Sequence, residues 1–258
     1  MTVVLGIDAA WTAGQPSGVA LLRQRGRRWE CLALAPSYAS FITGEVGWDE
    51  RPRGGLPDCG ALHAKAVELA GAAPDVIAID MPLATHPITA RRAADNAIAS
   101  AYATRGLGAH SPSPERPGPL ADAMRLGFGA LGYRVAGTTT KPGTRGVLIE
   151  VFPHASAIAL LGASSRVPYK LARITQYWPE RDAPARRRAL LAQWTKLRRA
   201  LAAHIAGGEL RVPVRGTLAA LKRYEDALDA LLCAWSGASY LAGHLHPHGD
   251  ADAAVWAP

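Results

Sequence analysis

Acidic side chains recur where short apolar runs of the sequence end. Asp8 follows the first such run, Asp80 closes the run Val76–Ile79, and Glu150 lies in the later run Val147–Phe152. Runs of four to eight apolar residues bounded by turn residues are typical of buried strands. These three acids are therefore predicted to lie at or near strand ends.

Two further acids, Asp226 and Asp229, lie three residues apart in the segment Thr217–Tyr240, which is predicted to be helical. Residues at this spacing are neighbours on one helix face, and Leu228 and Trp235 supply apolar surface that would pack the helix on a sheet. Helix acids that face strand-end acids repel them. A hard divalent cation with oxygen ligands relieves that repulsion, so Mg²⁺ or Mn²⁺ is the predicted cofactor.

Each acid also has a structural interpretation. Asp8 and Asp80 would be ordinary turn or strand-end acids, and the helix acids would face solvent, paired with Lys222 or Arg223. Glu150 would pair with an arginine at an edge strand. The order of the acids favours a shared site: one after a strand that opens a hairpin, one after a later strand, then two on a late helix.

The composition limits the class of protein. The chain has 258 residues, of which 49% are apolar, so there is enough material for a buried core and wholesale disorder is excluded. The apolar runs are too short to span a membrane, and the N-terminus reads as a strand start, not a signal peptide. Three widely spaced cysteines suggest neither a disulfide framework nor a cysteine-ligated zinc. A cytoplasmic setting is expected.

Positive charge is concentrated in one part of the chain. The net charge is +8, and only Glu180, Asp182 and Glu209 oppose the basic residues between 166 and 223. Such a block favours nucleic acid, DNA or RNA, as a partner; the alternative is a solvated helical surface. The basic residues are Arg166, Lys170, Arg173, Arg181, Arg186, Arg187, Arg188, Lys196, Arg198, Arg199, Arg211, Arg215, Lys222 and Arg223.

The elements form a predicted α/β domain that spans residues 1–258. Thr2–Ala10, Val19–Leu22 and Trp29–Ala35 are predicted to be an antiparallel meander, followed by a helix at Cys59–Ala72. Elaborations are expected around 84–145 and in the basic helical segment around 166–223. Further helices are expected at Ile88–Thr104, Ala121–Leu131, His154–Leu161 and Ala185–Ala206, with a loop at Gly106–Pro119 and a His/Pro/Gly tail from Gly243 that leads into Ala253–Trp256.

The ordered motifs resemble the RNase H-like superfamily, particularly its RuvC-type resolvase branch. More closely, the chain resembles the domain of unknown function 429 family, which is described as predicted nucleases of RNase H fold. The pieces that carry the resemblance are Gly6-Ile7-Asp8, Ile79-Asp80-Met81-Pro82, Arg91 and Arg92 with Asp95 and Arg105, Ser111-Pro112-Ser113, Glu150-Val151-Phe152-Pro153 and Tyr224-Glu225-Asp226-Ala227-Leu228-Asp229-Ala230.

The resemblance implies a mixed five-stranded sheet whose first three strands are antiparallel, flanked by helices. It also implies a metal-dependent nuclease in which Asp8, Asp80 and one or both of Asp226 and Asp229 bind the metal, with Glu150 as an optional member. The resolvase pattern has a glutamate at the position of Asp80, so the metal geometry there would differ.

Basic residues are the candidates for holding substrate phosphate, because a guanidinium matches the geometry of a phosphate group. These are Arg91, Arg92, Arg105 and Lys170, each of which would otherwise be a surface charge. His110, beside the loop Ser111–Pro114, is a candidate for proton transfer or an ordinary loop histidine.

Two other functions fit parts of the pattern. A phosphotransferase or ATPase of the sugar-kinase and actin class would bring Asp8 and the turn Ala13–Gly18 to ATP phosphates. It would also need a glycine-rich adenosine-binding segment late in the chain, which the sequence lacks. A non-catalytic nucleic-acid-binding protein would use the basic segment alone, and would have no use for uncompensated acids.

Overall fold

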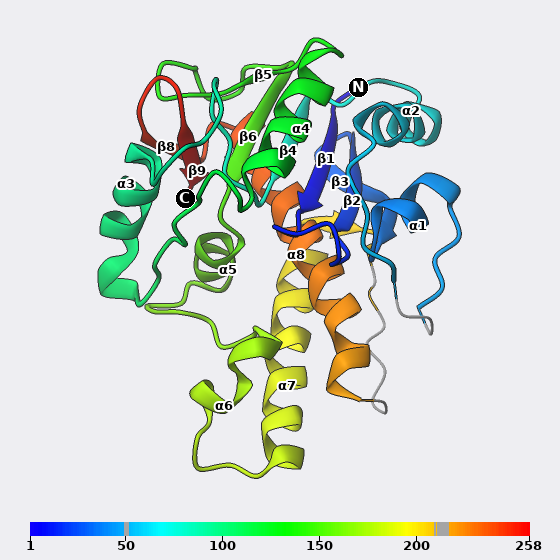
Figure 1. Cartoon of the computed structure of the whole chain (residues 1–258). Helices are drawn as coiled ribbons and strands as arrows, with labels where there is room; N and C mark the ends of the chain where they lie inside the picture. The colour runs from blue at the N-terminus through cyan, green and yellow to red at the C-terminus, as the bar shows by residue number, and fades with distance from the viewer. Residues whose placement is uncertain (49–51, 209, 211–216) are drawn as a thin grey trace.

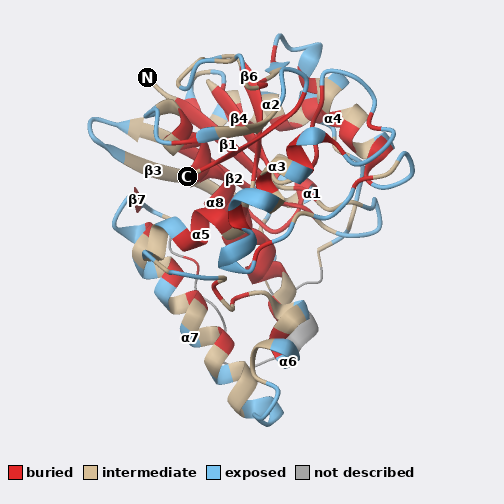
Figure 2. Ribbon diagram, turned by 90° about the vertical axis from the view of Figure 1, so that its left-hand side faces the viewer, coloured by how far each residue is buried: buried red, intermediate tan, exposed pale blue. Residues whose placement is uncertain are grey.

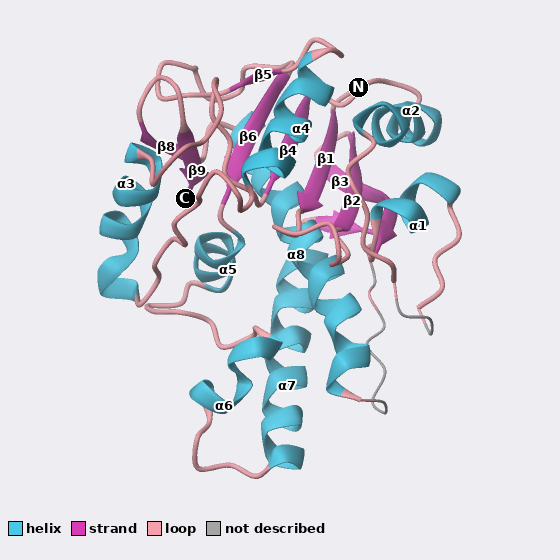
Figure 3. Ribbon diagram, viewed as in Figure 1, coloured by secondary structure: helices cyan, strands magenta, loops and turns pink. Residues whose placement is uncertain are grey.

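The structure, a computed structural model, describes residues 1–48, 52–208, 210 and 217–258 (Figure 1). Its described strands form one mixed sheet in the order β7-β3-β2-β1-β4-β6-β9-β8, with β5 paired to β6. Figure 3 shows this sheet with helices packed around it. The α/β class is as predicted, but the sheet has nine strands where five were expected.

The first three strands form the predicted antiparallel meander. They are β1 (Val3–Asp8), β2 (Gly18–Arg25) and β3 (Arg28–Ala35). Gly26 forms the tight turn between β2 and β3 with a φ of 62°, a conformation that glycine adopts without steric cost. The predicted antiparallel pairing of these three segments is confirmed.

Parallel strands extend the sheet from β1. β4 (Val76–Ile79) pairs with β1 so that Ile79 lies opposite Ile7, and β6 (Val147–Val151) pairs with β4. Side chains of β4 alternate between two buried apolar clusters, one on each face of the sheet. Because both faces are covered, this strand reads as a continuous apolar run.

Four short strands that were not predicted extend the sheet from the expected five strands to nine. They are β5 (Arg134–Val135), β7 (Ile205–Ala206), β8 (His246–Gly249) and β9 (Ala254–Ala257). The tail, expected to be mainly a loop, forms a hairpin in which β9 pairs parallel to β6. β7 occupies the end of the predicted helix Ala185–Ala206. Such short strands lack an apolar period of their own, since pairing with a longer strand creates them.

The predicted helices are present in order with shifted ends, and two short helices, α1 and α6, were not predicted. The segment predicted to be helical from Ile88 begins instead at Ala93, where the backbone N–H of Arg92 donates to Asp95 Oδ2 at 2.8 Å. The helices are α1 (Tyr38–Thr43), α2 (Cys59–Ala70), α3 (Ala93–Tyr102), α4 (Gly118–Gly129), α5 (Pro153–Leu161), α6 (Ile174–Tyr177), α7 (Ala183–Ala202) and α8 (Leu218–Leu241), with 3₁₀ turns η1 (Ala103–Arg105) and η2 (Leu171–Arg173).

Helix α8 crosses the sheet at very close range, as Figure 1 shows. A Cβ atom added to Gly6 of β1 would lie 2.4 Å from the backbone nitrogen of Ala234, and one added to Gly18 of β2 would lie 2.2 Å from the carbonyl oxygen of Asp226. Only glycine allows this approach. The two glycines therefore position the helix acids beside the end of β1.

Burial differs between α8 and α7, which lie beside each other. Figure 2 shows α8 buried where it crosses the sheet, whereas much of α7 is exposed or half-buried. Buried residues recur along α7 at Leu190, Trp194, Leu197 and Leu201, the spacing of one packed helix face. The cationic side chains of α7 occupy the remaining surface.

None of the helices in the described part of the chain is both long enough and apolar enough to cross a membrane.

Candidate functional site

Asp8 and Asp80 lie side by side at the same edge of the sheet. Ile7 and Ile79 are paired across the parallel strands β1 and β4, and the N–H of Asp80 donates to the carbonyl of Ile7 at 2.9 Å. Both acids are half-buried. They line one cavity of about 420 Å³, here called the strand-end cleft, together with Ala9, Ala10, Trp11, His110, Ser111, Ser113 and Arg116.

The carboxylates of Asp8 and Asp80 are uncompensated by direct contacts: within the described ranges, no hydrogen bond or ion pair reaches either of them. Burial raises the pKa of Asp8 well above its usual value, and the charge of Asp229 raises it further. Burial raises the pKa of Asp80 to about 7, although the charge of Lys170 opposes the rise. The pair therefore favours binding of a proton or a cation.

Asp229 is neutralised from outside its own helix. Its carboxylate is fully buried and accepts hydrogen bonds from Tyr169 Oη at 2.7 Å and Lys170 Nζ at 2.5 Å. Tyr169 and Lys170 precede the turn η2, about sixty residues earlier in the chain. A buried ion pair of this kind retains its charge because both partners are hydrogen-bonded.

Asp226 is neutralised within α8. It forms an ion pair with Lys222, one turn earlier, and Lys222 also pairs with Glu225 at 3.1 Å. Burial raises the pKa of Asp226 to about 6, while Lys222 opposes the rise. Glu225 in turn accepts a hydrogen bond from the backbone N–H of Leu171. This last contact ties η2 to α8.

The acids differ in their fit to a metal ion. Among the described residues, no three histidine, cysteine, aspartate or glutamate side chains form a metal-binding group. Asp8 and Asp80 still suit a hard cation that takes one or two carboxylates plus water and phosphate oxygens. Asp226 and Asp229 are engaged by lysines. Their role as metal ligands stays a prediction, and the lysines compete with a metal ion for their oxygens.

Glu150 belongs to a buried ion-pair network. It accepts two hydrogen bonds from the guanidinium of Arg92, at 2.6 and 2.8 Å, and one from the N–H of Leu83 at 2.8 Å. Arg92 also pairs with Asp95 at 2.6 Å. The network joins β6 to the loop after β4 and to α3. The predicted catalytic role of Glu150 and phosphate contact of Arg92 remain predictions, and this pairing opposes both.

The other predicted phosphate-binding residues are dispersed. Arg91 donates to Ser111 Oγ and Asn96 Oδ1, both at 2.6 Å, so it holds the loop that carries His110. Arg105 lies 5.7 Å from the ring of Tyr102. Neither arginine lines a cleft at the acids. Lys170, by contrast, lies at the centre of the acidic cluster.

Aromatic and basic groups that the sequence analysis did not single out complete the strand-end cleft. The ring of Trp11 lies edge-on to that of His110, with centroids 6.1 Å apart, and the guanidinium of Arg116 lies 6.0 Å from Trp11. Trp11 could have been found from the sequence, because it follows Asp8 by only three residues. Arg116 is far from all of the acids in the sequence, so no local pattern pointed to it.

Two further cavities adjoin the acids. The turn cleft, about 580 Å³, shares Asp8 with the strand-end cleft and includes Lys222 and Asp226. The basic cleft, about 440 Å³, shares Asp80 with it and extends to His154, Arg166, Lys170 and Arg173. The two strand-end acids therefore stand where three clefts meet. The turn cleft is completed by Ala10, Gly14, Gln15, Pro16, Pro52, Thr217 and Arg223.

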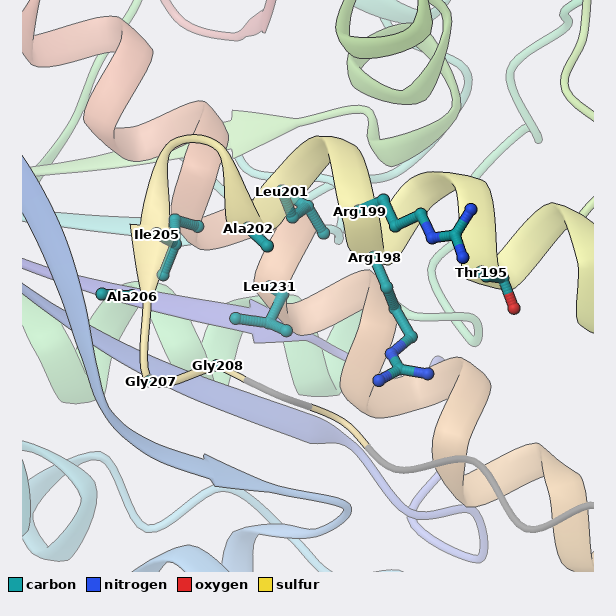
Figure 4. Close-up of a pocket in the computed structure, with 10 residues that line it drawn as sticks. All are labelled: Thr195, Arg198, Arg199, Leu201, Ala202, Ile205, Ala206, Gly207, Gly208 and Leu231. Atoms are coloured by element: carbon teal, nitrogen blue, oxygen red, sulfur yellow. The ribbon is translucent and has the colours of Figure 1, made fainter.

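The basic segment carries a separate cavity of about 490 Å³ (Figure 4). Arg198 and Arg199 of α7 extend beside it, and Leu201, Ile205 and Leu231 give it apolar walls. It has no residue in common with the three clefts at the acids. Of the predicted basic residues, Arg211 and Arg215 lie outside the described residues.

Comparisons with known proteins identify the family alone. Comparison with curated proteins found no match, and comparison with solved structures found none. One family model, described as "Protein of unknown function (DUF429)", matches residues 6–253. This match covers every acid of the candidate site and nearly the whole chain. The chain therefore belongs to the DUF429 family.

Proposed function

We propose that this protein is a divalent-metal-dependent nuclease that hydrolyses phosphodiester bonds of nucleic acid. The observation that carries the proposal is the pair Asp8 and Asp80. These two carboxylates open into one cleft at the ends of neighbouring parallel strands, and the described part of the chain supplies no direct partner for either. Uncompensated half-buried acids are costly unless a cation binds them.

The proposal includes an RNase H-like fold for the core of the sheet. The strand order β3-β2-β1-β4-β6, with β2 antiparallel to its neighbours and α8 packed across the sheet, supports it. This is the arrangement that the resemblance in sequence implies. The outer strands β5, β7, β8 and β9 would be additions to that core.

Each group of residues in the clefts has a separate role in the proposed reaction. Asp8 and Asp80 would hold Mg²⁺ or Mn²⁺, which when bound activates water and offsets charge on the phosphate. Lys170 and Lys222 offset the negative charge of the helix acids, so the cleft repels a polyanion less. Trp11 offers a ring on which a base would stack, and Arg116 beside it suits a phosphate.

The test is cleavage of varied DNA and RNA substrates with Mg²⁺ or Mn²⁺. Asp8→Asn is expected to lower the rate by about a hundredfold or more. Asp122→Asn is the matched control, because Asp122 pairs with Arg125 on α4, away from the clefts, and should cleave as the unmodified protein does. If no substrate is cleaved and calorimetry finds no metal binding, the proposal is wrong. Metal-independent binding that Asp8→Asn leaves unchanged would instead identify a non-catalytic nucleic-acid-binding protein.

One observation favours a second candidate, a phosphotransferase or ATPase. The turn after β1 contributes Gly14, Gln15 and Pro16 to the turn cleft beside Asp8, which is where such an enzyme would place ATP phosphates. Hydrolysis of ATP without cleavage of any nucleic acid would favour this candidate. Both reactions use Asp8, so the substrate decides between them.

A further inference from the structure

The basic cleft gathers positive charge directly beside Asp80. Arg166, Arg173 and Lys170 line it. Lys170 is paired with Asp229, but among the described residues neither Arg166 nor Arg173 forms an ion pair with an acid. The cleft is also lined by Asp80 and by three acids that have basic partners: Asp95 and Glu150 pair with Arg92, and Glu225 pairs with Lys222. Within the described part of the chain, Arg166 and Arg173 therefore line the cleft without a carboxylate in direct contact.

Arg166 is held in place by the backbone. Its Nε donates to the carbonyl of Gly106 at 2.8 Å, and its own N–H donates to the carbonyl of Arg105 at 2.8 Å. One edge of the guanidinium is thus fixed to the turn after α3. A guanidinium fixed by one edge is oriented to bind an oxyanion with its remaining N–H groups.

His154 contributes a buried atom that lacks a partner. Its Nδ1 is buried and has no hydrogen bond within the described part of the chain. The ring lies between two others, with centroids 5.1 Å from Tyr169 and 6.0 Å from Phe152. Buried polar atoms are nearly always satisfied by the protein, water or a ligand. His154 lines the basic cleft, as Arg166 and Arg173 do, so its ring is a candidate third group for a ligand bound there.

His154 would offer an anion a hydrogen bond and no charge. Burial lowers its pKa well below the ordinary value, and Lys170, Arg166 and Arg173 lower it further. The ring is therefore neutral at neutral pH, when one of its nitrogens carries a hydrogen. Two guanidinium groups and one imidazole N–H match an anion with several acceptor oxygens, and phosphate has that chemistry.

We propose that the basic cleft is a phosphate-binding subsite, in which Arg166, Arg173 and His154 bind a phosphate group of the substrate next to Asp80. The identity of that phosphate as part of a nucleic acid rests on the proposed function. The subsite itself does not, because inorganic phosphate should bind there without metal and without cleavage. A substrate would then extend from Trp11 in the strand-end cleft, past the acid pair, to Arg166.

The first experiment measures binding of inorganic phosphate to the full chain by calorimetry without divalent metal, against chloride at equal ionic strength. Arg166→Gln, Arg173→Gln and His154→Phe are each expected to weaken phosphate binding about tenfold, the loss of one charge-assisted or buried hydrogen bond. Arg25→Gln removes one exposed positive charge far along β2 and is the matched control, expected to bind phosphate as the unmodified protein does.

The His154→Phe variant separates a binding role from a structural one. It removes an unpartnered buried nitrogen and retains a ring between Phe152 and Tyr169, so it should fold with at least the original melting temperature. Retained stability with weakened phosphate binding supports the inference. The inference fails if all three variants bind phosphate like the unmodified protein, or if chloride and phosphate are indistinguishable.

Two oligonucleotides identify the source of the phosphate, with Asp8→Asn used to prevent cleavage. Tighter binding of a 5′-phosphorylated tetranucleotide than of its 5′-hydroxyl form, lost on adding Arg166→Gln, assigns the subsite to a terminal phosphate. Equal binding of both forms, weakened equally by Arg166→Gln, assigns it to an internal phosphodiester. If the protein binds phosphate but cleaves no nucleic acid, the subsite is supported and the nuclease proposal is wrong. If it cleaves nucleic acid and Arg166→Gln has no effect on binding or cleavage, the subsite proposal alone is wrong.

Discussion

The strand-end acids, Asp8 and Asp80, and the helix acids, Asp226 and Asp229, lie close enough to interact electrostatically, yet among the described residues only the helix acids have basic partners in contact. Asp226 and Asp229 each have a lysine in contact, and Asp229 has a tyrosine as well. Asp8 and Asp80 have neither and open into a cleft. Carboxylates of one type, brought together by one helix crossing one sheet, are thus divided into a compensated pair and an uncompensated pair. The uncompensated pair is where a cation or substrate has most to contribute.

The two lysines explain the division. Lys222 lies one turn before Asp226, the spacing at which oppositely charged helix residues meet. Lys170 reaches Asp229 from another element. No equivalent basic residue follows β1 or β4 closely: the segments after them are Ala9-Ala10-Trp11 and Met81-Pro82-Leu83. The strand ends therefore expose their acids to the cleft.

The largest expected effect is on stability. Asp229→Ala leaves Lys170 and the hydroxyl of Tyr169 without their partner, so it should lower the free energy of unfolding by about 3–5 kcal/mol. Asp8→Ala removes an uncompensated acid and should change that free energy by less than about 1 kcal/mol or raise it. Urea denaturation of both variants measures the difference. Equal losses of unfolding free energy in the two variants would show that the helix acids and the strand-end acids do not differ in this way.

The next effect is a dependence of stability on pH. The pKa of Asp80 is raised to about 7 and that of Asp226 to about 6, whereas both have ordinary values near 4 in the unfolded chain. Between pH 4 and 7 the folded state then binds more protons, so the free energy of unfolding should fall as pH rises.

The expected fall that is due to Asp80 is on the order of 4 kcal/mol, from a rise of about three pKa units. Asp80→Asn should remove this part of the dependence, and Asp122→Asn should retain it. Thermal melts from pH 4 to 8 provide the measurement. Parallel curves for Asp80→Asn and the unmodified protein would show that Asp80 does not titrate in this window.

A smaller effect is expected from divalent metal. Mg²⁺ at about ten times its dissociation constant should stabilise the folded protein by about 1.4 kcal/mol. Asp8→Asn should abolish this gain, while Asp226→Asn should keep it, because Lys222 already neutralises Asp226. Melting temperatures with and without Mg²⁺ test both variants. If Asp226→Asn also abolished the stabilisation by Mg²⁺, Asp226 would be a metal ligand, and the helix acids and strand-end acids would form one site.

The smallest effect distinguishes the two lysines. The side chain of Lys222 is 44% exposed and that of Lys170 is 20% exposed. Solvent screens the ammonium of Lys222, although its partners Glu225 and Asp226 are buried, so Lys222→Met should cost on the order of 1–2 kcal/mol of unfolding free energy. Lys170→Met should cost clearly more, because it leaves the fully buried Asp229 without a cation and, among the described residues, with only the hydroxyl of Tyr169 as a partner. A double-mutant cycle with each acid gives both coupling energies, and a larger value for Lys222 would contradict the assignment.

Much of the fold could be predicted because its signals are local. The meander β1–β3, the strands β4 and β6, and the helix α8 each carry an apolar period or run of their own. β7 and the tail hairpin could not be predicted, since β8 reads His246-Pro247-His248-Gly249 and becomes a strand by pairing with β9. The start of α3 was placed five residues early because Arg92 and Asp95 cap it from within.

Local patterns in the sequence were enough to predict which acids could meet: Asp8 and Asp80 end strands, and Asp226 and Asp229 share a helix face. The contact between Lys222 and Asp226 was also readable, since four-residue spacing on a helix is local. The remaining contacts join residues far apart in the sequence, so they depend on the three-dimensional fold. Lys170 pairs with Asp229, 59 positions later, and Arg92 pairs with Glu150, 58 positions later. His154, which lines the same cleft as Arg166 and Arg173, has a buried nitrogen without a hydrogen bond among the described residues. Charge pairing depends on distance in space, which a pattern of neighbouring residues does not encode.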